Sequence, residues 1–176
     1  MKSLLDPATL DLRLKEIKLL LLDVDGILTN GSLFFVEGQG WTRTYNVYDG
    51  YGIKLIQSLG IPVGVISGGH SNELKERLRV LGISYSVLGS EDKLKSLQQI
   101  MMETGVAAHQ ICFMADELFD IPALVAVGLA IGVPNACSEV KEIAHYITSK
   151  RGGEGAVREV IDLLRRAQNL VPSVSF

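Results

Sequence analysis

Asp23 and Asp25 are the residues of this 176-residue chain whose types and spacing most clearly predict chemistry. They directly follow the apolar run 19–22, and Gly26 behind them allows the backbone to turn sharply. Such a run, bounded by a turn, predicts a buried strand, and open α/β sheets bind their ligands at the carboxyl ends of their strands. Two carboxylates this close repel each other, so we expect a cation or a catalytic role to compensate.

Two alternatives for this pair are structural. One makes Asp25 the N-cap of a helix, but the β-branched and glycine residues of 26–31 are a poor helix start. The other places DVDG in a calcium loop, but a strand precedes it and the series of ligands that an EF-hand needs does not follow. The rest of the chain therefore decides between catalysis and structure.

Three further groups of polar residues follow expected strands or begin expected helices. Ser67 and Gly68 come directly after the apolar run 61–66, where a hydroxyl and backbone N–H groups suit a phosphate oxygen, although a plain turn has the same pattern. Lys93 lies near the start of a predicted helix, 91–104. A lysine there is usually solvated, and its positive charge slightly opposes the helix macrodipole.

An acidic group forms the third of these. Asp116, Glu117 and Asp120 follow the apolar run 111–114 and suggest a cation, although acidic residues are also favoured at a helix N-terminus. Taken together, the groups predict phosphoryl transfer. One carboxylate attacks phosphorus, a second protonates the leaving oxygen, and a lysine with Mg²⁺ neutralises the transferring oxygens.

The elements that must position these residues alternate between strands and helices. A mostly parallel, doubly wound α/β sheet is therefore predicted, with a projecting β-hairpin at 32–36 and 41–47. The strands are expected at 18–22, 61–66, 84–88, 111–114, 129–133 and 146–148. The helices are expected at 7–15, 49–59, 71–81, 91–104, 121–127, 138–144 and 154–169.

Composition predicts a single domain, 1–176, with a full core. Hydrophobic residues make up 47% and charged residues 21%, which excludes disorder, and the net charge of −3 disfavours nucleic acid as a partner. No apolar run is long enough to cross a membrane, and the charged N-terminal segment does not resemble a signal peptide. Cys112 and Cys137 lack metal-ligand spacing, and a disulfide is not expected. We expect a cytoplasmic protein.

These motifs, in this order, resemble the haloacid dehalogenase superfamily over essentially the whole chain. The more specific likeness is to its small capless branch, the 3-deoxy-D-manno-octulosonate 8-phosphate phosphatases. It rests on NVYDGYGIKLI (46–56), LGSEDKL (88–94), VPNAC (133–137) and GGEGAVREV (152–160). The resemblance implies a Rossmann-like fold without a cap domain and Mg²⁺-dependent hydrolysis of a sugar-acid phosphate in lipopolysaccharide biosynthesis.

The resemblance also implies a role for each candidate residue. Asp23 would form an aspartyl-phosphate, and Asp25 would act first as acid and then as base. Mg²⁺ would be held by Asp23, the backbone carbonyl of Asp25, and Asp116. The phosphoryl group would be bound by Ser67, Gly68 and Lys93, and the metal's waters would be oriented by Glu117 and Asp120.

The chain departs from the family's pattern at several positions. Glu117 stands where the family usually has Asp, so the side chain that carries this carboxylate is longer. Arginine is common in the family at the positions of Tyr48, Gly69 and Glu154. Five cationic residues are candidates to supply the missing charge, although each is individually expected to be a solvated surface residue. They are Arg43, His70, Lys150, Arg151 and Arg158.

These departures concern the substrate more than the reaction, because related nonulosonate 9-phosphate phosphatases can carry GGEG, as here. Octulosonate 8-phosphate is the first choice and a sialic-acid-type nonulosonate 9-phosphate is the alternative. A non-catalytic phosphatase-like binding module is a further alternative, but such domains tend to lose the aspartate pair. A dehalogenase would not need an acid at Asp25.

The hairpin 32–47 is the one predicted element outside the alternating sheet. Apolar residues occupy both of its faces, and an isolated two-stranded hairpin is marginal in water. They are Leu33, Phe34, Phe35, Val36, Trp41 and Tyr45. We therefore expect an oligomer, a homotetramer by family resemblance, in which neighbouring subunits cover the active sites. The alternative is that the hairpin folds back onto its own domain.

Overall fold

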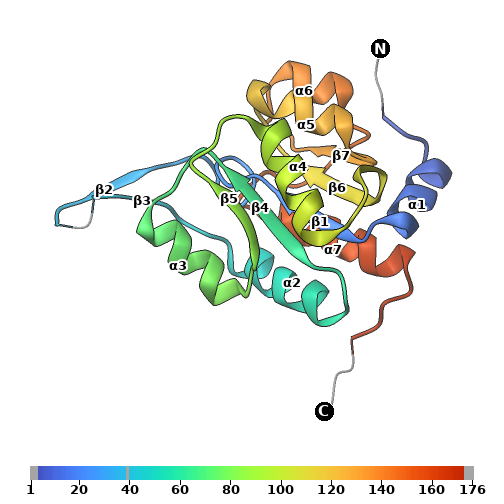
Figure 1. The fold of residues 1–176 in the computed structure, drawn as a ribbon, viewed down its shortest axis with the longest axis horizontal. Coiled ribbons are helices and arrows are strands. Elements are labelled where there is room, and N and C mark those ends of the chain that lie inside the picture. Colours follow the sequence, from blue (N-terminus) through green and yellow to red (C-terminus); the bar gives the residue numbers. More distant parts are fainter. Residues whose placement is uncertain (1–3, 39, 173–176) are drawn as a thin grey trace.

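Six parallel strands form the central sheet of the computed structural model, which describes residues 4–38 and 40–172 (Figure 1). Their order across the sheet is β5-β4-β1-β6-β7-β8. The strands are β1 (Leu19–Leu22), β4 (Val63–Ser67), β5 (Tyr85–Leu88), β6 (Ile111–Met114), β7 (Leu129–Gly132) and β8 (Tyr146–Ile147). This is the doubly wound α/β fold that the alternation of elements predicts.

Helices cover both faces of this sheet. On one face α2 packs against α3 and α7, and α7 packs against α1; on the other, α5 packs against α4 and α6. The helices are α1 (Pro7–Glu16), α2 (Val47–Ser58), α3 (Asn72–Leu81), α4 (Lys93–Thr104), α5 (Ile121–Ala126), α6 (Ser138–Ile143) and α7 (Ala156–Ala167). Two short 3₁₀ turns, Ala108–Gln110 and Leu118–Asp120, were not predicted.

Strand β1 is the centre of the sheet. All four of its leucines are fully buried, with Leu21 opposite Gly64 of β4 on one side and Phe113 of β6 on the other. From β1 the chain moves outward through β4 and β5, then crosses back to β6 on the opposite side. The carboxyl end of β1 is therefore a topological switch point, where open α/β sheets bind their ligands.

One predicted boundary is wrong, between the hairpin and the next helix. The second arm was expected to run to residue 47 and the helix to begin at 49, but the strand ends at Thr42 and α2 begins at Val47. The reason is Asn46, whose side chain accepts hydrogen bonds from the backbone N–H groups of Tyr48 (2.8 Å) and Asp49 (3.3 Å). This N-cap outweighs the strand preference of the surrounding aromatic and β-branched residues.

The other predicted elements are present, with ends shifted by one or two residues. Gly82 and Gly105 end α3 and α4 in the left-handed conformation, as expected of glycine at a helix C-terminus. Asp92 caps α4, so that this helix begins at Lys93 rather than at 91. Within the described part of the chain, no helix is both long and apolar enough to cross a membrane.

The predicted hairpin consists of β2 (Phe34–Val36) and β3 (Gly40–Thr42) and extends away from the sheet and its helices (Figure 1). The Phe35 and Trp41 rings meet edge to face at 5.5 Å, yet their side chains are 64% and 62% exposed. The hairpin therefore does not fold back onto its own domain. Tyr45 was wrongly counted with these exposed residues, because it is partly buried against the core, with the Arg77 guanidinium over its ring.

Candidate active site

The parallel strands bring the predicted residues to one edge of the sheet. Asp23 directly follows β1, Ser67 is the last residue of β4, and Asp116 follows β6 by two residues. The neighbouring strands β4 and β6 flank β1, so these three side chains converge from separate parts of the chain. The strand ends therefore bring together polar residues that the sequence predicts to form one site.

Lys93 is the cation at the centre of this edge. It is the first residue of α4, and its side chain is completely buried. Its Nζ donates to Asp23 Oδ1 at 2.6 Å and to the backbone carbonyl of Ile66 at 3.2 Å, and lies 3.0 Å from Asp120 Oδ1. Lys93 is therefore not the solvated lysine that its position near a helix N-terminus allowed.

Three carboxylates surround this single ammonium group. Oxygens of Asp23, Asp116 and Asp120 lie within 4.8 Å of one another. Burial raises the pKa of Asp23 to about 7, against the opposing charge of Lys93. Burial, reinforced by the charges of Asp23 and Asp120, raises the pKa of Asp116 to about 8. These raised pKa values mean that Lys93 alone does not stabilise three ionised carboxylates at this point.

The donor set fits a hard divalent cation. Asp116 Oδ1 is buried, and among the described residues it has no hydrogen-bond partner. A buried carboxylate oxygen without a partner is costly, and a bound cation would satisfy it. Carboxylate and carbonyl oxygens are the ligands that Mg²⁺ prefers in proteins. The geometry of Asp23 and Asp116 is therefore compatible with the magnesium site that the sequence predicts.

Asp120 and Glu117 occupy different environments. Asp120 is fully buried, and its Oδ2 accepts from the backbone N–H of Glu117 at 3.1 Å. Burial raises the pKa of Asp120, although Lys93 opposes this. The Glu117 carboxylate is exposed and accepts from the backbone N–H of Leu118 at 2.7 Å. Asp120 therefore joins the carboxylate cluster directly, whereas Glu117 caps the following 3₁₀ turn.

Asp25 lies beside the cluster but contacts a different cation. The Arg43 guanidinium donates to both of its carboxylate oxygens, from Nε at 2.7 Å and from Nη2 at 2.9 Å. The Thr29 hydroxyl lies 3.4 Å from Asp25 Oδ1. The expectation that Arg43 is a solvated surface residue is wrong, because only 9% of its side chain is exposed.

Ser67 and Gly68 form the remaining predicted contact. Ser67 is buried, and its hydroxyl oxygen accepts from the backbone N–H of Gly69 at 3.1 Å. Gly68 is exposed at the turn. This turn follows β4 at the same sheet edge as Asp23. Because the Ser67 oxygen acts as an acceptor from Gly69, its O–H group can donate to an anion at that edge.

Asn135 is a site residue that the pattern of strand ends does not reveal. Its side-chain amide donates to the Gly26 carbonyl at 3.3 Å and accepts from the backbone N–H of Gly152 at 3.0 Å. It therefore ties the loop after β7 and the loop before α7 to the turn that carries Asp23 and Asp25. Asn135 belongs to VPNAC and Gly152 to GGEGAVREV, so these segments hold the site together.

Tyr48 and Glu154, two of the positions at which the resemblance implies arginine, line one cavity. Tyr48 and Glu154 share a hollow of about 320 Å³ with Lys150, Arg158 and two further residues. The Arg158 Nε donates to Asp162 at 3.1 Å, so part of this positive charge is neutralised. Lys150 and Arg158 thus lie in the same cavity as Tyr48 and Glu154, whereas His70 and Arg151 are exposed and do not line it.

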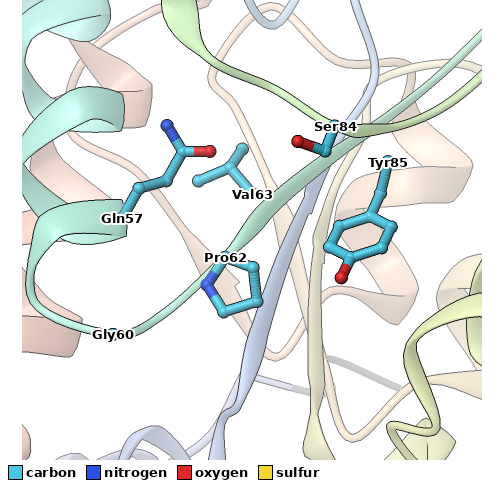
Figure 2. Close-up of a pocket in the computed structure, with 6 residues that line it drawn as sticks. All are labelled: Gln57, Gly60, Pro62, Val63, Ser84 and Tyr85. Atoms are coloured by element: carbon cyan, nitrogen blue, oxygen red, sulfur yellow. The ribbon is translucent and has the colours of Figure 1, made fainter.

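A separate cavity of about 280 Å³ lies at the opposite edge of the sheet. Figure 2 shows its lining residues, which come from the end of α2 and the starts of β4 and β5. They are Gln57, Gly60, Pro62, Val63, Ser84 and Tyr85. None of these residues is charged, so this cavity lacks the groups that phosphoryl transfer requires.

Comparison with known proteins agrees with this geometry. Residues 87–161 match the family model described as haloacid dehalogenase-like hydrolase. The chain is similar to 3-deoxy-D-manno-octulosonate 8-phosphate phosphatases from Yersinia pestis, with 35% identity over 89% of this chain and 84% of the relative, and from Haemophilus influenzae, with 36% identity over 89% and 87%.

Solved structures give the same result. A Moraxella catarrhalis 3-deoxy-D-manno-octulosonate 8-phosphate phosphatase, in complex with a magnesium ion, a phosphate ion and a KDO molecule, is similar with a TM-score of 0.90. It is 35% identical, and the match covers 93% of this chain and 94% of that one. The cobalt-bound enzyme from Haemophilus influenzae gives a TM-score of 0.86 at 36% identity, covering 89% and 92%.

Proposed function

The chain belongs to the haloacid dehalogenase-like hydrolases and, within them, to the 3-deoxy-D-manno-octulosonate 8-phosphate phosphatases, and we propose that it hydrolyses that sugar phosphate in a Mg²⁺-dependent reaction of lipopolysaccharide biosynthesis. The products are the free sugar acid and phosphate. The observation that carries the proposal is the 2.6 Å contact between Lys93 Nζ and Asp23 Oδ1 inside a cluster of three carboxylates.

Asp23 is the nucleophile in this proposal. A carboxylate oxygen attacks phosphorus, the bond between phosphorus and the sugar oxygen breaks, and the phosphoryl group is carried on Asp23. Lys93 holds the Asp23 carboxylate through Oδ1 and offsets the negative charge of the transferring oxygens. Ser67 and Gly68 bind those oxygens through the hydroxyl and a backbone N–H. Water then attacks phosphorus, which releases phosphate and restores the carboxylate.

Asp25 moves the protons. It protonates the leaving sugar oxygen in the first step and accepts a proton from the attacking water in the second. Both of its oxygens accept from Arg43 in this structure, and each keeps a further lone pair that can take a proton.

Mg²⁺ fits the donor set of Asp23, the Asp25 backbone carbonyl and Asp116, and Asp120 in the same cluster would orient the water around it. The same role for Glu117 would require its carboxylate to leave the backbone N–H of Leu118. When bound, the ion supplies Lewis-acid stabilisation of the charge on the phosphoryl oxygens. Its positive charge also favours the ionised forms of Asp23 and Asp116, whose pKa values are otherwise raised to about 7 and about 8.

Steady-state phosphate release tests this proposal. With Mg²⁺, 3-deoxy-D-manno-octulosonate 8-phosphate is expected to have a higher kcat/KM than a nonulosonate 9-phosphate or p-nitrophenyl phosphate. EDTA is expected to lower turnover by roughly 100-fold or more, because the negative charge that develops on the phosphoryl oxygens is then no longer stabilised by a metal ion. Added Mg²⁺ should restore it. Equal turnover with and without chelator would contradict the metal dependence, and no turnover of any phosphate ester would favour a binding module.

A second substrate class is supported by a specific observation. Tyr48 and Glu154 line one cavity, so two neighbouring positions lack the arginines common in the family. A nonulosonate 9-phosphate is the alternative that tolerates this difference. If its kcat/KM is much higher than that of the octulosonate, the first substrate choice is wrong and the phosphatase mechanism stands.

We further propose that the protein is a homotetramer in which the β2–β3 hairpins pack together and neighbouring subunits shield the active sites. The exposed Phe35 and Trp41 side chains support this assembly, since such apolar patches usually mark interfaces. Light scattering at the assay concentration is expected to give the tetramer mass, and Trp41→Ser is expected to shift the protein toward smaller species. A fully active monomer would contradict the proposal.

A further inference from the structure

The guanidinium group of Arg43 is bound entirely by groups at the edge of the candidate site. Its Nε and Nη2 donate to the two oxygens of Asp25, and its Nη1 donates to Ser71 Oγ at 3.2 Å and to Glu73 Oε2 at 3.3 Å. Hydrogen bonding to Asp25 raises the pKa of Arg43 further above its ordinary value, so this group is permanently cationic. Arg43 reaches this position from the segment that follows the hairpin strand β3.

Gly69 makes room for this guanidinium. A Cβ atom at residue 69 would lie 2.8 Å from Arg43 Nη2 and 3.4 Å from Ser67 Oγ. The Nη2 group and the Ser67 hydroxyl are therefore both next to the same point above the end of β4. A hydroxyl and a guanidinium group that converge on one point are a suitable pair of donors for phosphate oxygens.

The partner of Arg43 is only half-buried. Of the Asp25 side chain, 44% is exposed, compared with 9% for Arg43, so the bidentate pair has one face open to solvent. A phosphoryl group carries more negative charge than one carboxylate and presents three oxygens, so it competes effectively for a forked donor. Ser71 and Glu73 contact Nη1 alone, so they can hold that end of the guanidinium independently of the partners of Nε and Nη2.

We propose that Arg43 binds the phosphoryl group of the substrate, transferring N–H donors from Asp25 to phosphoryl oxygens beside Ser67. This inference rests on the phosphatase function proposed above. It assigns to the segment after β3 a direct contact with the reacting group, and it leaves Asp25 with fewer competing hydrogen bonds when it handles protons. The alternative is that the pair only anchors the hairpin to the domain.

Binding of inorganic phosphate in the presence of Mg²⁺, measured by calorimetry, separates these possibilities without turnover. Arg43→Ala is expected to weaken phosphate binding roughly 10- to 100-fold, as befits a lost charge-assisted contact, and to raise KM for phosphate esters. Binding of the free sugar acid, which has a carboxylate but no phosphate, should not change. Arg43→Lys should be intermediate, because an ammonium group cannot form the fork.

Arg79→Ala is the matched control. Arg79 forms the same forked contact with a carboxylate, Glu76, at 2.8 and 2.7 Å, but it lies on the surface of α3. Its loss should leave phosphate binding unchanged. Thermal unfolding checks that each variant is folded, and Arg43→Lys carries the test if the alanine variant is not.

The double variant Arg43→Ala/Gly69→Arg provides a rescue. The Cβ atom of a side chain at position 69 would lie 2.8 Å from the present position of Arg43 Nη2, and an arginine there returns a guanidinium to the space beside Ser67. Recovery of phosphate affinity is expected in the double variant, whereas Gly69→Arg alone should crowd Arg43 and weaken binding.

The inference is overturned if folded Arg43→Ala binds phosphate as tightly as the wild type, which would leave only the anchoring role. It is also overturned if the loss appears with the free sugar acid and not with phosphate. Failure of the proposed substrate would instead appear in the wild-type kinetics, whichever way the phosphate measurements turn out.

Discussion

Asp23→Asn is expected to abolish phosphate release, with a loss on the order of 10⁴-fold or more in kcat. An amide oxygen is a poor nucleophile, and Asp120, the other described carboxylate within 3.0 Å of Lys93 Nζ, is fully buried. The fold should survive, because the side-chain amide oxygen of the variant can still accept from Lys93 Nζ, which lies 2.6 Å from Asp23 Oδ1 in the wild type. Phosphate release by the purified variant, with thermal unfolding measured in parallel, checks both statements.

Asp11→Asn is the control for this substitution. Asp11 is an exposed carboxylate of α1 that pairs with Lys15 at 2.5 Å, so its replacement changes the same charge away from the site. It should leave turnover unchanged, since a surface pair of this kind contributes little. Normal phosphate release by folded Asp23→Asn protein would remove the aspartyl-phosphate mechanism from consideration.

The sequence was sufficient to predict the fold and the location of the site for physical reasons. The leucines of 19–22 are apolar on both faces because β1 is covered on both faces, and Gly82 and Gly105 end helices through left-handed backbone. Once parallel strands are predicted, their carboxyl ends must share one edge. Asp23, Ser67 and Asp116 could therefore be grouped without knowledge of any distance.

Other features depend on tertiary contacts that no local pattern encodes. Arg43 was one of five candidate cations, and only the folded chain distinguishes the one that reaches Asp25 across an irregular segment. Asn135 is 109 residues from Gly26 in sequence, so its hydrogen bond to that carbonyl has no local signal. The early start of α2 was predictable in principle, because Asn46 is a favourable N-cap residue.

Gly26→Ala is expected to weaken Mg²⁺ binding by roughly 10- to 100-fold and to lower turnover with it, because it displaces a carboxylate of the cluster. Gly26 has a φ of +92°, and a Cβ atom there would lie 2.0 Å from Asp116 Oδ2 and 2.5 Å from its Cγ. The Asp116 side chain must therefore rotate away, while the backbone can stay. Calorimetric titration of Mg²⁺ and phosphate release at saturating Mg²⁺ measure the two effects.

Gly31→Ala separates this displacement from backbone strain. Gly31 has a similar φ of +81°, but nothing lies within 4 Å of the position of its Cβ. Both variants should lose about 1 kcal/mol of unfolding free energy from the positive φ, which is measurable by denaturant titration of the metal-free proteins. Only Gly26→Ala should also lose Mg²⁺ affinity. Equal Mg²⁺ affinity in the two variants would mean that the Asp116 carboxylate, in its present position, does not hold the ion.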